Sequence, residues 1–505
     1  MPHRTRPLQT YSIIETSPQL TCPPLEGVVE NNETTKMQNQ NSTFINQKLV
    51  IIGAGISGLT TAYWLKKAGF DVLVLEKDSQ PGGTMKTIHD NGWLIEQGPN
   101  SALETTPLFK QLFEELNIMD EVLYGNEASN NRYILRDGTL HSLPLSPRTF
   151  LMTELFSFFG KLRLLKEPFV GKATKEESIA EFVQRRLGRE FLDYAINPFV
   201  AGVYAGNPEQ LSVRAAFPKL YALEEKYGGL IKGMIKGARE RKKRAEKAKD
   251  RAKLFSFKLG MQTLPNALAS YLGDAVQYNS AVEHIIPMRA GKTPIYHVTY
   301  RQGEEKTTIE AKAVILASPA TATANIIRPI DPDMAKTLES IYYPAVSVAF
   351  LGFKREQVKH SLDGFGFLIP AKEKRKILGA LWSSTLFENR APEGYVALTT
   401  FVGGARSPEF AGKTDEQTIQ ITLDELKSLL GVEGSPVYSK IIHWDKAIPQ
   451  YNLGYQKILD SIERFEANFK GAFICSNYRG GISVGDCVMS AEKKANEIIK
   501  LFTET

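Results

Sequence analysis

The chain has 505 residues, 42% of them hydrophobic, and its 62 lysines and arginines against 56 aspartates and glutamates give a formal charge of +6 at pH 7. This length and apolar content exclude a wholly disordered chain and allow about three domains, or one large interrupted domain. Twelve basic and three acidic residues lie between Lys232 and Lys258, so this segment carries +9 and the rest of the chain −3. Because acid outweighs base outside one segment, the sequence argues against a nucleic-acid-binding protein.

Cysteine usage and hydropathy narrow the class further. Only Cys22, Cys475 and Cys487 are present, without a C-x-x-C pair, which argues against a disulfide framework or structural zinc and fits a reducing compartment. No stretch approaches the roughly 18 to 20 consecutive apolar residues that a spanning helix needs. Residues 1–47 are rich in Pro, Asn, Thr and Gln and have no apolar core, so we expect a disordered tail.

Order is expected to begin with a strand, a glycine turn and a helix. The β-branched run Lys48–Ile52 is typical of a strand buried on both faces, and Gly53-Ala54-Gly55-Ile56-Ser57-Gly58 leads into an apolar-periodic helix that ends near Ala68. A second predicted strand, Asp71–Leu75, ends in Glu76. The pattern is G-x-G-x-x-G in the strand, turn and helix context that a dinucleotide site requires.

Each residue of this pattern has a physical reason. Gly53 permits the tight turn, Gly55 lets the backbone approach a pyrophosphate, and Gly58 lets helix and strand pack closely. The helix N-terminus favours the phosphate charge, and Glu76 can accept hydrogen bonds from a ribose diol. The pattern predicts a dinucleotide but does not separate NAD from FAD.

Two further segments point to a flavin. Pro81-Gly82-Gly83-Thr84-Met85-Lys86-Thr87 follows Glu76 closely, and a predicted strand at Ala472–Ser476 leads through a glycine-rich turn, Asn477 to Asp486, into a helix that ends near Leu501. Together with the first turn, these segments resemble the flavin amine oxidase, carotenoid desaturase and protoporphyrinogen oxidase superfamily. The resemblance implies FAD and an α/β fold of the Rossmann-like p-hydroxybenzoate hydroxylase and amine oxidase type.

The superfamily also implies which residues hold the cofactor. The Gly-Gly pair lets the backbone lie close to the flavin, a strand at Ala313–Ala317 enters Ser318, and Asp486 contacts the ribityl or pyrophosphate region; the alternative for Asp486 is a helix N-cap. The cofactor-binding residues implied are Gly53, Gly55, Ser57, Gly58, Glu76, Lys77, Gly82, Gly83, Thr84, Gly98, Pro99, Val282, Ser318, Trp444, Gly481, Ile482, Val484 and Asp486.

A longer segment favours one branch of the superfamily. Asn197 to Pro208, continuing through Leu211 and Ser212, resembles the signature of oxygen-dependent protoporphyrinogen oxidases, and the resemblance extends from about Lys48 to Phe502. It implies FAD-dependent oxidation of protoporphyrinogen IX to protoporphyrin IX with O2, in three flavin turnovers that give H2O2, late in haem synthesis. Alternatives are oxidation of coproporphyrinogen III to coproporphyrin III, amine or carotenoid oxidation, and a flavin-carrying membrane scaffold without activity.

The resemblance also supplies substrate residues. Arg132, in Asn131-Arg132-Tyr133-Ile134, matches an arginine that holds a propionate; the alternative is a solvated arginine. Trp382 matches an aromatic position that stacks on a pyrrole ring. Phe365, Gly366 and Leu368 match the loop on the other side of the substrate; the alternative for them is a core strand. Asn100 matches an asparagine proposed to assist catalysis, and it could equally cap a following helix. The substrate-binding residues implied are Arg132, Gly202, Phe365, Gly366, Leu368 and Trp382. No metal and no covalent intermediate are expected.

The middle of the chain is predicted to be helical. Leu151–Leu165 has apolar residues at helical spacing and ends in basic residues, so it could lie in a membrane interface, as the family's inserted domain does, or be a buried helix. The basic run 232–258 could attract anionic lipid, at roughly 1 kcal/mol per cation, or be a solvated segment. We expect a peripheral protein of the cytoplasmic face of the membrane and allow a homodimer.

These expectations define four parts of the chain. They are a disordered tail at 1–47, a discontinuous FAD-binding domain at 48–130, 255–325 and 440–505, a helical membrane-associating domain at 140–254, and a mixed-sheet substrate-binding domain at 131–139 and 326–439.

Overall fold

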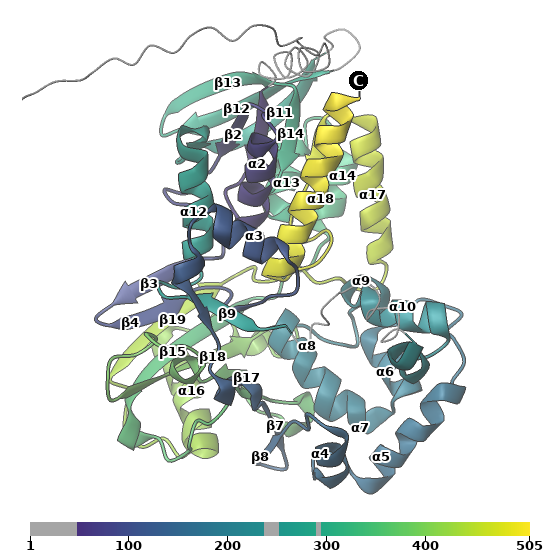
Figure 1. Ribbon diagram of the computed structural model, residues 1–505, viewed down its shortest axis with the longest axis vertical. Helices are drawn as coiled ribbons and strands as arrows, with labels where there is room; N and C mark the ends of the chain where they lie inside the picture. The colour runs from purple at the N-terminus through teal and green to yellow at the C-terminus, as the bar shows by residue number, and fades with distance from the viewer. Residues whose placement is uncertain (1–47, 237–251, 289–293, 505) are drawn as a thin grey trace, which may run out of the picture. The chain divides into compact units, whose positions relative to one another are not determined.

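The computed structural model describes residues 48–236, 252–288 and 294–504 (Figure 1). The tail at 1–47 and the centre of the basic run, 237–251, lie outside the described residues, so the expectations for them stay predictions.

A five-stranded parallel sheet carries the first glycine turn (Figure 1). Its strands, in spatial order, are β10 (Val276–Gln277), β2 (Val72–Leu75), β1 (Leu49–Ile52), β14 (Ala313–Leu316) and β20 (Ala472–Ile474). Every residue of β1, β2 and β14 is buried, as expected for apolar runs covered on both faces. The strands predicted from the sequence are confirmed, with ends shifted by no more than two residues.

Helices flank this sheet. On one face α2 (Ile56–Lys67) packs against α18 (Val484–Thr503) and α12 (Thr263–Leu272). The other elements of this part are α3 (Leu108–Glu115), α13 (Ala320–Ile327), α14 (Pro332–Glu339), α17 (Tyr455–Asn468), an antiparallel sheet of β11 (Ala281–Met288), β12 (Ile295–Gln302) and β13 (Glu305–Ala311), and a small sheet of β5 (Ala102–Leu103), β9 (Leu254–Phe257) and β6 (Val122–Tyr124).

A second large sheet is mixed. In spatial order its strands are β19 (Tyr438–Trp444), β15 (Val346–Lys354), β18 (Tyr395–Gly403), β17 (Ile377–Leu381), β16 (Gly366–Leu368), β7 (Tyr133–Arg136) and β8 (Thr139–Ser142). Neighbours are antiparallel except β16 and β7, which are parallel. Helix α16 (Asp415–Leu430) packs on one face, and the hairpin β3 (Thr87–Asp90) and β4 (Trp93–Glu96) contributes to the core on the other. We propose the domain division expected from the sequence, with one change. The substrate-binding domain ends at Trp444 and not at residue 439, because β19 belongs to the mixed sheet.

Helices fill the segment between β8 and β9, as predicted. They are α4 (Pro147–Met152), α5 (Phe158–Arg163), α6 (Ile179–Arg186), α7 (Arg189–Phe191), α8 (Asn197–Tyr204), α9 (Val213–Ala216) and α10 (Pro218–Tyr227), and α15 (Ser383–Leu386) lies outside the segment. Among the described residues, no helix is both long enough and apolar enough to cross a bilayer.

The single helix predicted over Leu151–Leu165 is wrong. Helix α4 ends at Met152, and α5 begins only after Ser157, which caps it. Between them the Leu155 carbonyl accepts a hydrogen bond from Arg136 (2.6 Å), and the Ser157 N–H donates to Glu190 (2.9 Å). These tertiary bonds use backbone groups that a continuous helix would need, so the sequence periodicity is interrupted.

A buried ion network holds the end of this segment. Arg186 and Glu167 are both fully buried, with 2.7 Å between Arg186 Nη1 and Glu167 Oε1, and Arg186 also pairs with Glu224. Glu167 accepts the N–H groups of Leu230 and Ile231 as well. Buried charges need this degree of pairing, because an unpaired ion in the interior is costly.

Candidate flavin and substrate site

The first glycine turn leaves open space at the N-terminus of α2. Gly53 has a φ of +107°, which residues with a side chain rarely adopt. A Cβ on Gly58 would lie 2.0 Å from the Gly53 carbonyl oxygen. A Cβ on Gly55 would have no neighbour within 4 Å, so contacts within the chain do not require glycine there. No side chain caps α2, so its first N–H groups are available to an anion. Ser57, in the first turn of the helix, is buried beside Cys487.

Glu76 is fixed beside this turn. Its carboxylate accepts the Ala54 N–H through Oε2 (2.6 Å) and the Asp78 N–H through Oε1 (2.9 Å), and the residue is buried. Each oxygen keeps a further lone pair with which to accept a ribose hydroxyl. Lys77, the next residue, is exposed, and its cofactor role stays a prediction.

The second glycine pair lies against the first turn. Gly82 donates its N–H to the Ala54 carbonyl (2.8 Å) and pairs with Gly55 in an isolated bridge. Gly82 and Gly83 both have positive φ, and a Cβ on Gly98 would lie 2.2 Å from the Thr84 carbonyl oxygen. Gly83 therefore lies against the backbone of Gly55 and Gly98 against that of Thr84, while Gly55 itself faces the open space.

Two further predicted residues lie near the same turn. A Cβ on Gly53 would lie 3.4 Å from the Ser318 nitrogen, directly after β14. The Ser280 N–H donates to the Glu76 carbonyl (2.7 Å), and Val282 follows two residues later in β11. The residues that follow three separate strands thus gather at the turn, as expected at the carboxyl edge of a parallel sheet.

The third glycine turn ends at α18. Gly481 has a φ of +124°, Ile482 is half-buried, and Val484 is the buried first residue of the helix. Ser483 caps α18 by accepting the Asp486 N–H (3.1 Å) and donates to Asp486 Oδ2 (2.6 Å). The N-cap alternative for Asp486 is therefore wrong, and its flavin contact stays a prediction.

Tyr451 fixes this turn, and sequence patterns alone did not single it out. Its hydroxyl accepts the Gly481 N–H (3.1 Å) and donates to the Asn477 carbonyl (2.7 Å). The ring stacks on Tyr455 with a centroid distance of 4.4 Å and meets Tyr204 of α8 edge-on. In the sequence Tyr451 stands between the polar residues Gln450 and Asn452, and no motif marks it.

Asn100 lies in the segment that follows β4. Its amide donates to the Gly98 carbonyl (3.2 Å), whereas α3 begins at Leu108 with Pro107 as its N-cap. The alternative that Asn100 caps the helix is wrong, and its catalytic role stays a prediction. Trp444 donates from Nε1 to the Gln97 carbonyl (2.8 Å), so it braces the same segment, which includes the half-buried Pro99.

Glu96 is a buried acid directly before this segment. It accepts hydrogen bonds from Thr87 Oγ1 (2.7 Å) and the Met261 N–H (2.8 Å), and Arg390 lies 3.8 Å away. Burial raises the pKa of Glu96 to about 7, although these three partners each lower it. Glu96 therefore changes charge near neutrality within a few residues of Asn100.

Arg132 and Phe365 are in contact at the edge of the mixed sheet. The guanidinium lies 5.1 Å from the Phe365 ring centroid, and burial lowers the pKa of Arg132. Arg132 is nevertheless exposed, and within the described chain no aspartate or glutamate contributes to the shift of its pKa. A cation held over an aromatic ring without a counter-ion is suited to bind a ligand carboxylate.

Helix α8 and strand β16 form an apolar wall. A Cβ on Gly202 would lie 2.7 Å from Leu368 Cδ2, so glycine is needed for α8 to approach β16. Phe199 and Val203, which share a helix face with Gly202, are 41% and 39% exposed. Gly366 has a φ of +135°, and its Cβ would meet the Ala380 carbonyl at 2.1 Å.

Trp382 is not on this wall. Its side chain is fully buried in the core beneath the mixed sheet, beside Tyr133 and His360 at centroid distances of 5.4 and 4.8 Å. This location argues against stacking on a substrate, because no face of the indole is exposed. Its Nε1 has no hydrogen-bond partner.

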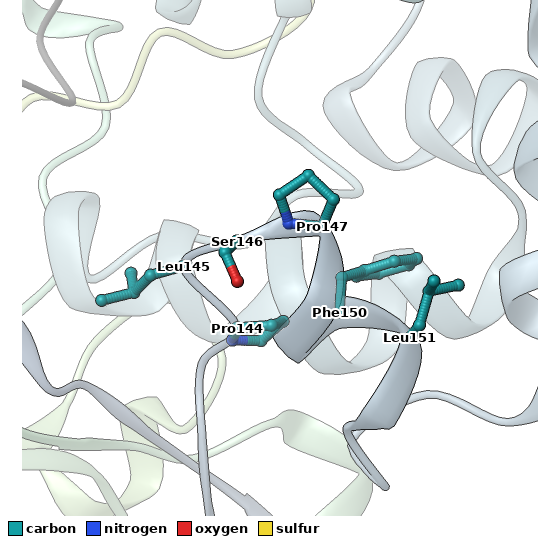
Figure 2. A pocket seen from close by; sticks show the side chains of 6 residues that line it. All are labelled: Pro144, Leu145, Ser146, Pro147, Phe150 and Leu151. Atoms are coloured by element: carbon teal, nitrogen blue, oxygen red, sulfur yellow. The ribbon is translucent and has the colours of Figure 1, made fainter.

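An apolar surface lies outside the glycine turns. We call it the apolar surface segment, residues 145–169; its large apolar side chains, 43 to 89% exposed, are Leu145, Leu151, Met152, Phe158, Phe159, Leu162, Leu165 and Phe169. Figure 2 shows an open pocket at its start, lined by Pro144, Leu145, Ser146, Pro147, Phe150 and Leu151. Lys161 lies within the segment but turns its Nζ to the carbonyls of Leu151 and Thr153.

The open space at Gly55, the uncapped α2 and the buried Glu76 fit a dinucleotide cofactor such as FAD at the carboxyl edge of the parallel sheet. Residues 56–499 match the family of flavin containing amine oxidoreductases, whose cofactor is FAD. Among solved structures, a putative protoporphyrinogen oxidase from Exiguobacterium aligns with a TM-score of 0.73 and 23% identity, over 90% of this chain and 99% of that one. Reduced UDP-galactopyranose mutase aligns with a TM-score of 0.67 and 16% identity, over 90% and 96%. These two likenesses show the fold.

Curated relatives are more specific. The chain is 35% identical over 482 residues to the mitochondrial protoporphyrinogen oxidase of Nicotiana tabacum, which covers 90% of this chain and 95% of that one. It is 34% identical to protoporphyrinogen oxidase 2 of Arabidopsis thaliana, over 90% and 94%, and 28% identical to the coproporphyrinogen III oxidase of Bacillus subtilis, over 87% and 95%. The chain belongs to the protoporphyrinogen oxidase family within the flavin amine oxidase superfamily.

Proposed function

We propose that the protein oxidises protoporphyrinogen IX to protoporphyrin IX, late in haem biosynthesis, with O2 as the acceptor. The observation that carries the proposal is the 35% identity to a protoporphyrinogen oxidase over nearly the full length of both chains. FAD held at the Gly55 turn, the α2 N-terminus and Glu76 would supply the hydride acceptor for three turnovers, with O2 as the final oxidant and H2O2 as its product.

The residues of the chain hold and orient the substrate in this proposal. Arg132 binds a propionate, and the exposed apolar face of α8 with Leu368 forms a wall for the wide tetrapyrrole. Gly202 keeps the wall flat, because any side chain there would meet Leu368. Asn100, held by the Gly98 carbonyl, orients a pyrrole N–H.

Coproporphyrinogen III is the second candidate substrate. The 28% identity to a coproporphyrinogen III oxidase over 95% of its length favours it as a specific alternative. The two substrates share an apolar ring system but differ by two propionates, so electrostatics near the pocket decides between them.

One experiment tests the proposal. The purified, FAD-loaded protein is given each porphyrinogen in air, and kcat/KM is measured from porphyrin fluorescence. We expect the larger value with protoporphyrinogen IX. A strong preference for coproporphyrinogen III would replace the proposed substrate, and no oxidation of either would overturn the porphyrinogen assignment.

We also propose that the apolar surface segment contacts a membrane. Its support is the concentration of exposed phenylalanines and leucines, which no described part of the chain covers. Large apolar patches on a protein surface mark binding sites for lipid or protein. Lys161 is turned inward, whereas Arg148, Glu154 and Lys166 are exposed among the apolar side chains, a mixture typical of a surface that lies in a membrane interface.

A further inference from the structure

Burial lowers the pKa of three arginines in the described chain, namely Arg132, Arg390 and Arg406. Arg390 faces Glu96, whereas neither Arg132 nor Arg406 forms an ion pair with any described carboxylate. For Arg406 the effect is large, and its pKa falls to about 10. The exposed Arg132 and the half-buried Arg406 therefore lack a counter-ion within the described chain.

Arg406 is bound only by neutral groups. One guanidinium nitrogen donates to Asn197 Oδ1 and another to the Ile369 carbonyl (3.0 Å), while Nε is buried without an acceptor. A guanidinium removed from water without a counter-charge is costly. Such an arrangement is explained if an anion from outside the chain completes the site.

The two arginines lie at opposite ends of β16. Arg132 lies over the ring of Phe365, the residue before the strand, and Arg406 donates to Ile369, the residue after it. Residues 365 to 369 of an extended chain span about 13 Å. The two guanidinium groups are thus held near the two ends of one short strand.

The strand between the two arginines packs against α8. Ile134 pairs with Leu368 in the parallel register of β7 and β16, and Arg132 lies two residues before Ile134, just ahead of β7. Leu368 meets Gly202 of α8. Arg406 reaches the same helix at its first residue, Asn197.

We propose that Arg406 is a second carboxylate anchor, which binds one acidic side chain of the porphyrinogen while Arg132 binds another. The inference rests on the proposed function, since it takes a porphyrinogen as the ligand. The Arg406 guanidinium forms a charge-assisted pair with the carboxylate, and no bond is made or broken. Asn197 and Ile369 orient the guanidinium for this contact.

The test uses a stable dicarboxylic porphyrin, mesoporphyrin IX, and its dimethyl ester as probes. Their Kd values for the FAD-loaded protein are measured by fluorescence quenching. Arg406→Met is expected to weaken binding of the free acid by about tenfold or more and that of the ester by less than twofold. Arg406→Lys should restore part of the lost affinity for the acid. Equal weakening for acid and ester would overturn the proposal, because it would indicate a structural role.

Two further variants keep the test decisive. Asn197→Asp places a carboxylate of the chain beside Arg406, so it should weaken binding of the acid alone, even if Arg406→Met fails to fold. Unchanged binding of the acid in Asn197→Asp would contradict the anchor. Arg355→Met is the control, since Arg355 is likewise bound only by neutral groups, the backbone carbonyls of Val358, His360 and Ser361.

The anchor and the proposed function fail in different ways. If the wild-type protein oxidises porphyrinogen but Arg406→Met discriminates neither probe, only the anchor is wrong. If the wild-type protein neither oxidises porphyrinogen nor binds the porphyrin acid, the proposed function is wrong as well.

Discussion

The first glycine turn and the apolar surface segment are fixed in opposite ways. At the turn, Gly58 is required because a Cβ there would lie 2.0 Å from a carbonyl oxygen of the same chain. In the segment, Phe159 and Phe169 are 80% and 89% exposed and gain little from the fold. The comparison teaches that a residue type can be set by the chain itself or by what the chain binds, and burial separates the two cases. Gly55 lies at the turn, but a Cβ there would have no neighbour within 4 Å, so its identity is set by what the chain binds.

The largest effect is expected from two single changes at the turn. Gly58→Ala should prevent close packing of α2 on β1, with loss of bound FAD and of stability, because the new methyl group meets backbone. Gly55→Ala should leave the apoprotein folded, since its methyl group enters only the open space. It should weaken FAD binding by tenfold or more, a loss of binding free energy on the order of 1.4 kcal/mol. Flavin content after gel filtration and the unfolding temperature of the apoprotein measure both.

The control for these changes is Gly171→Ala, where a Cβ also has no neighbour within 4 Å and the residue is exposed, in the helical segment. Gly171→Ala should change neither the flavin content nor the unfolding temperature of the apoprotein. If Gly55→Ala kept full FAD affinity, the open space would not be the cofactor site.

A large effect on lipid binding is expected from three exposed phenylalanines. Replacing Phe158, Phe159 and Phe169 by serine should reduce sedimentation with liposomes by at least about a hundredfold, as each buried phenylalanine contributes about 1.5 to 3 kcal/mol. The unfolding temperature should hardly change, because these side chains are 69 to 89% exposed. Leu155→Ala is the matched change in the same segment; Leu155 is fully buried, so this variant should lose about 2 to 5 kcal/mol of stability. Undiminished sedimentation of the triple variant would contradict the membrane proposal.

A smaller effect is expected at Tyr451. Tyr451→Phe keeps the stacked ring but removes the hydroxyl that bridges the Gly481 N–H and the Asn477 carbonyl. The third glycine turn should loosen, and FAD affinity should fall by about three- to thirtyfold, as expected for one or two lost hydrogen bonds. The flavin absorbance spectrum should shift, which a change confined to remote packing would not produce. Tyr455→Phe is the comparison. It removes a hydroxyl that donates to the Tyr478 carbonyl, and it should change the flavin spectrum less than Tyr451→Phe does.

The smallest effect is a pH dependence at Glu96. Because its folded pKa is about 7 against an ordinary 4.5, the folded protein binds more protons than the unfolded chain between these values, and stability falls as pH rises through that window. Glu96→Gln should remove this fall, which is at most about 1.4 kcal/mol per pH unit. Unfolding temperatures of both proteins from pH 5 to 8 test the prediction. Parallel curves would show that Glu96 does not titrate there.

Local patterns predicted the nucleotide side well because its constraints are local. Gly53, Gly55 and Gly58 stand within six residues, and the strands around them are apolar runs. The helix break at Ser157 was not predictable, since it depends on Arg136 and Glu190, which are distant in sequence. The burial of Trp382 argues against its predicted role for a related reason, because the family position fixes where its backbone lies but not which face of the sheet its ring joins.

Arg406 shows a limit of a different kind. Its sequence context, after Gly403 and Gly404, gives no sign of a binding role. Only the lack of a carboxylate beside a buried guanidinium singles it out, and that is a property of three-dimensional surroundings.

The ion network at Glu167 bears on how this protein can be engineered. Truncating residues 145–169 to obtain a more tractable sample would strand Arg186 in the interior without one of its carboxylates and leave Glu190 without Ser157. The excised form would carry a buried charge and fail to fold. A version suited to crystallisation should therefore keep the backbone of the segment whole and exchange only its outward phenylalanines.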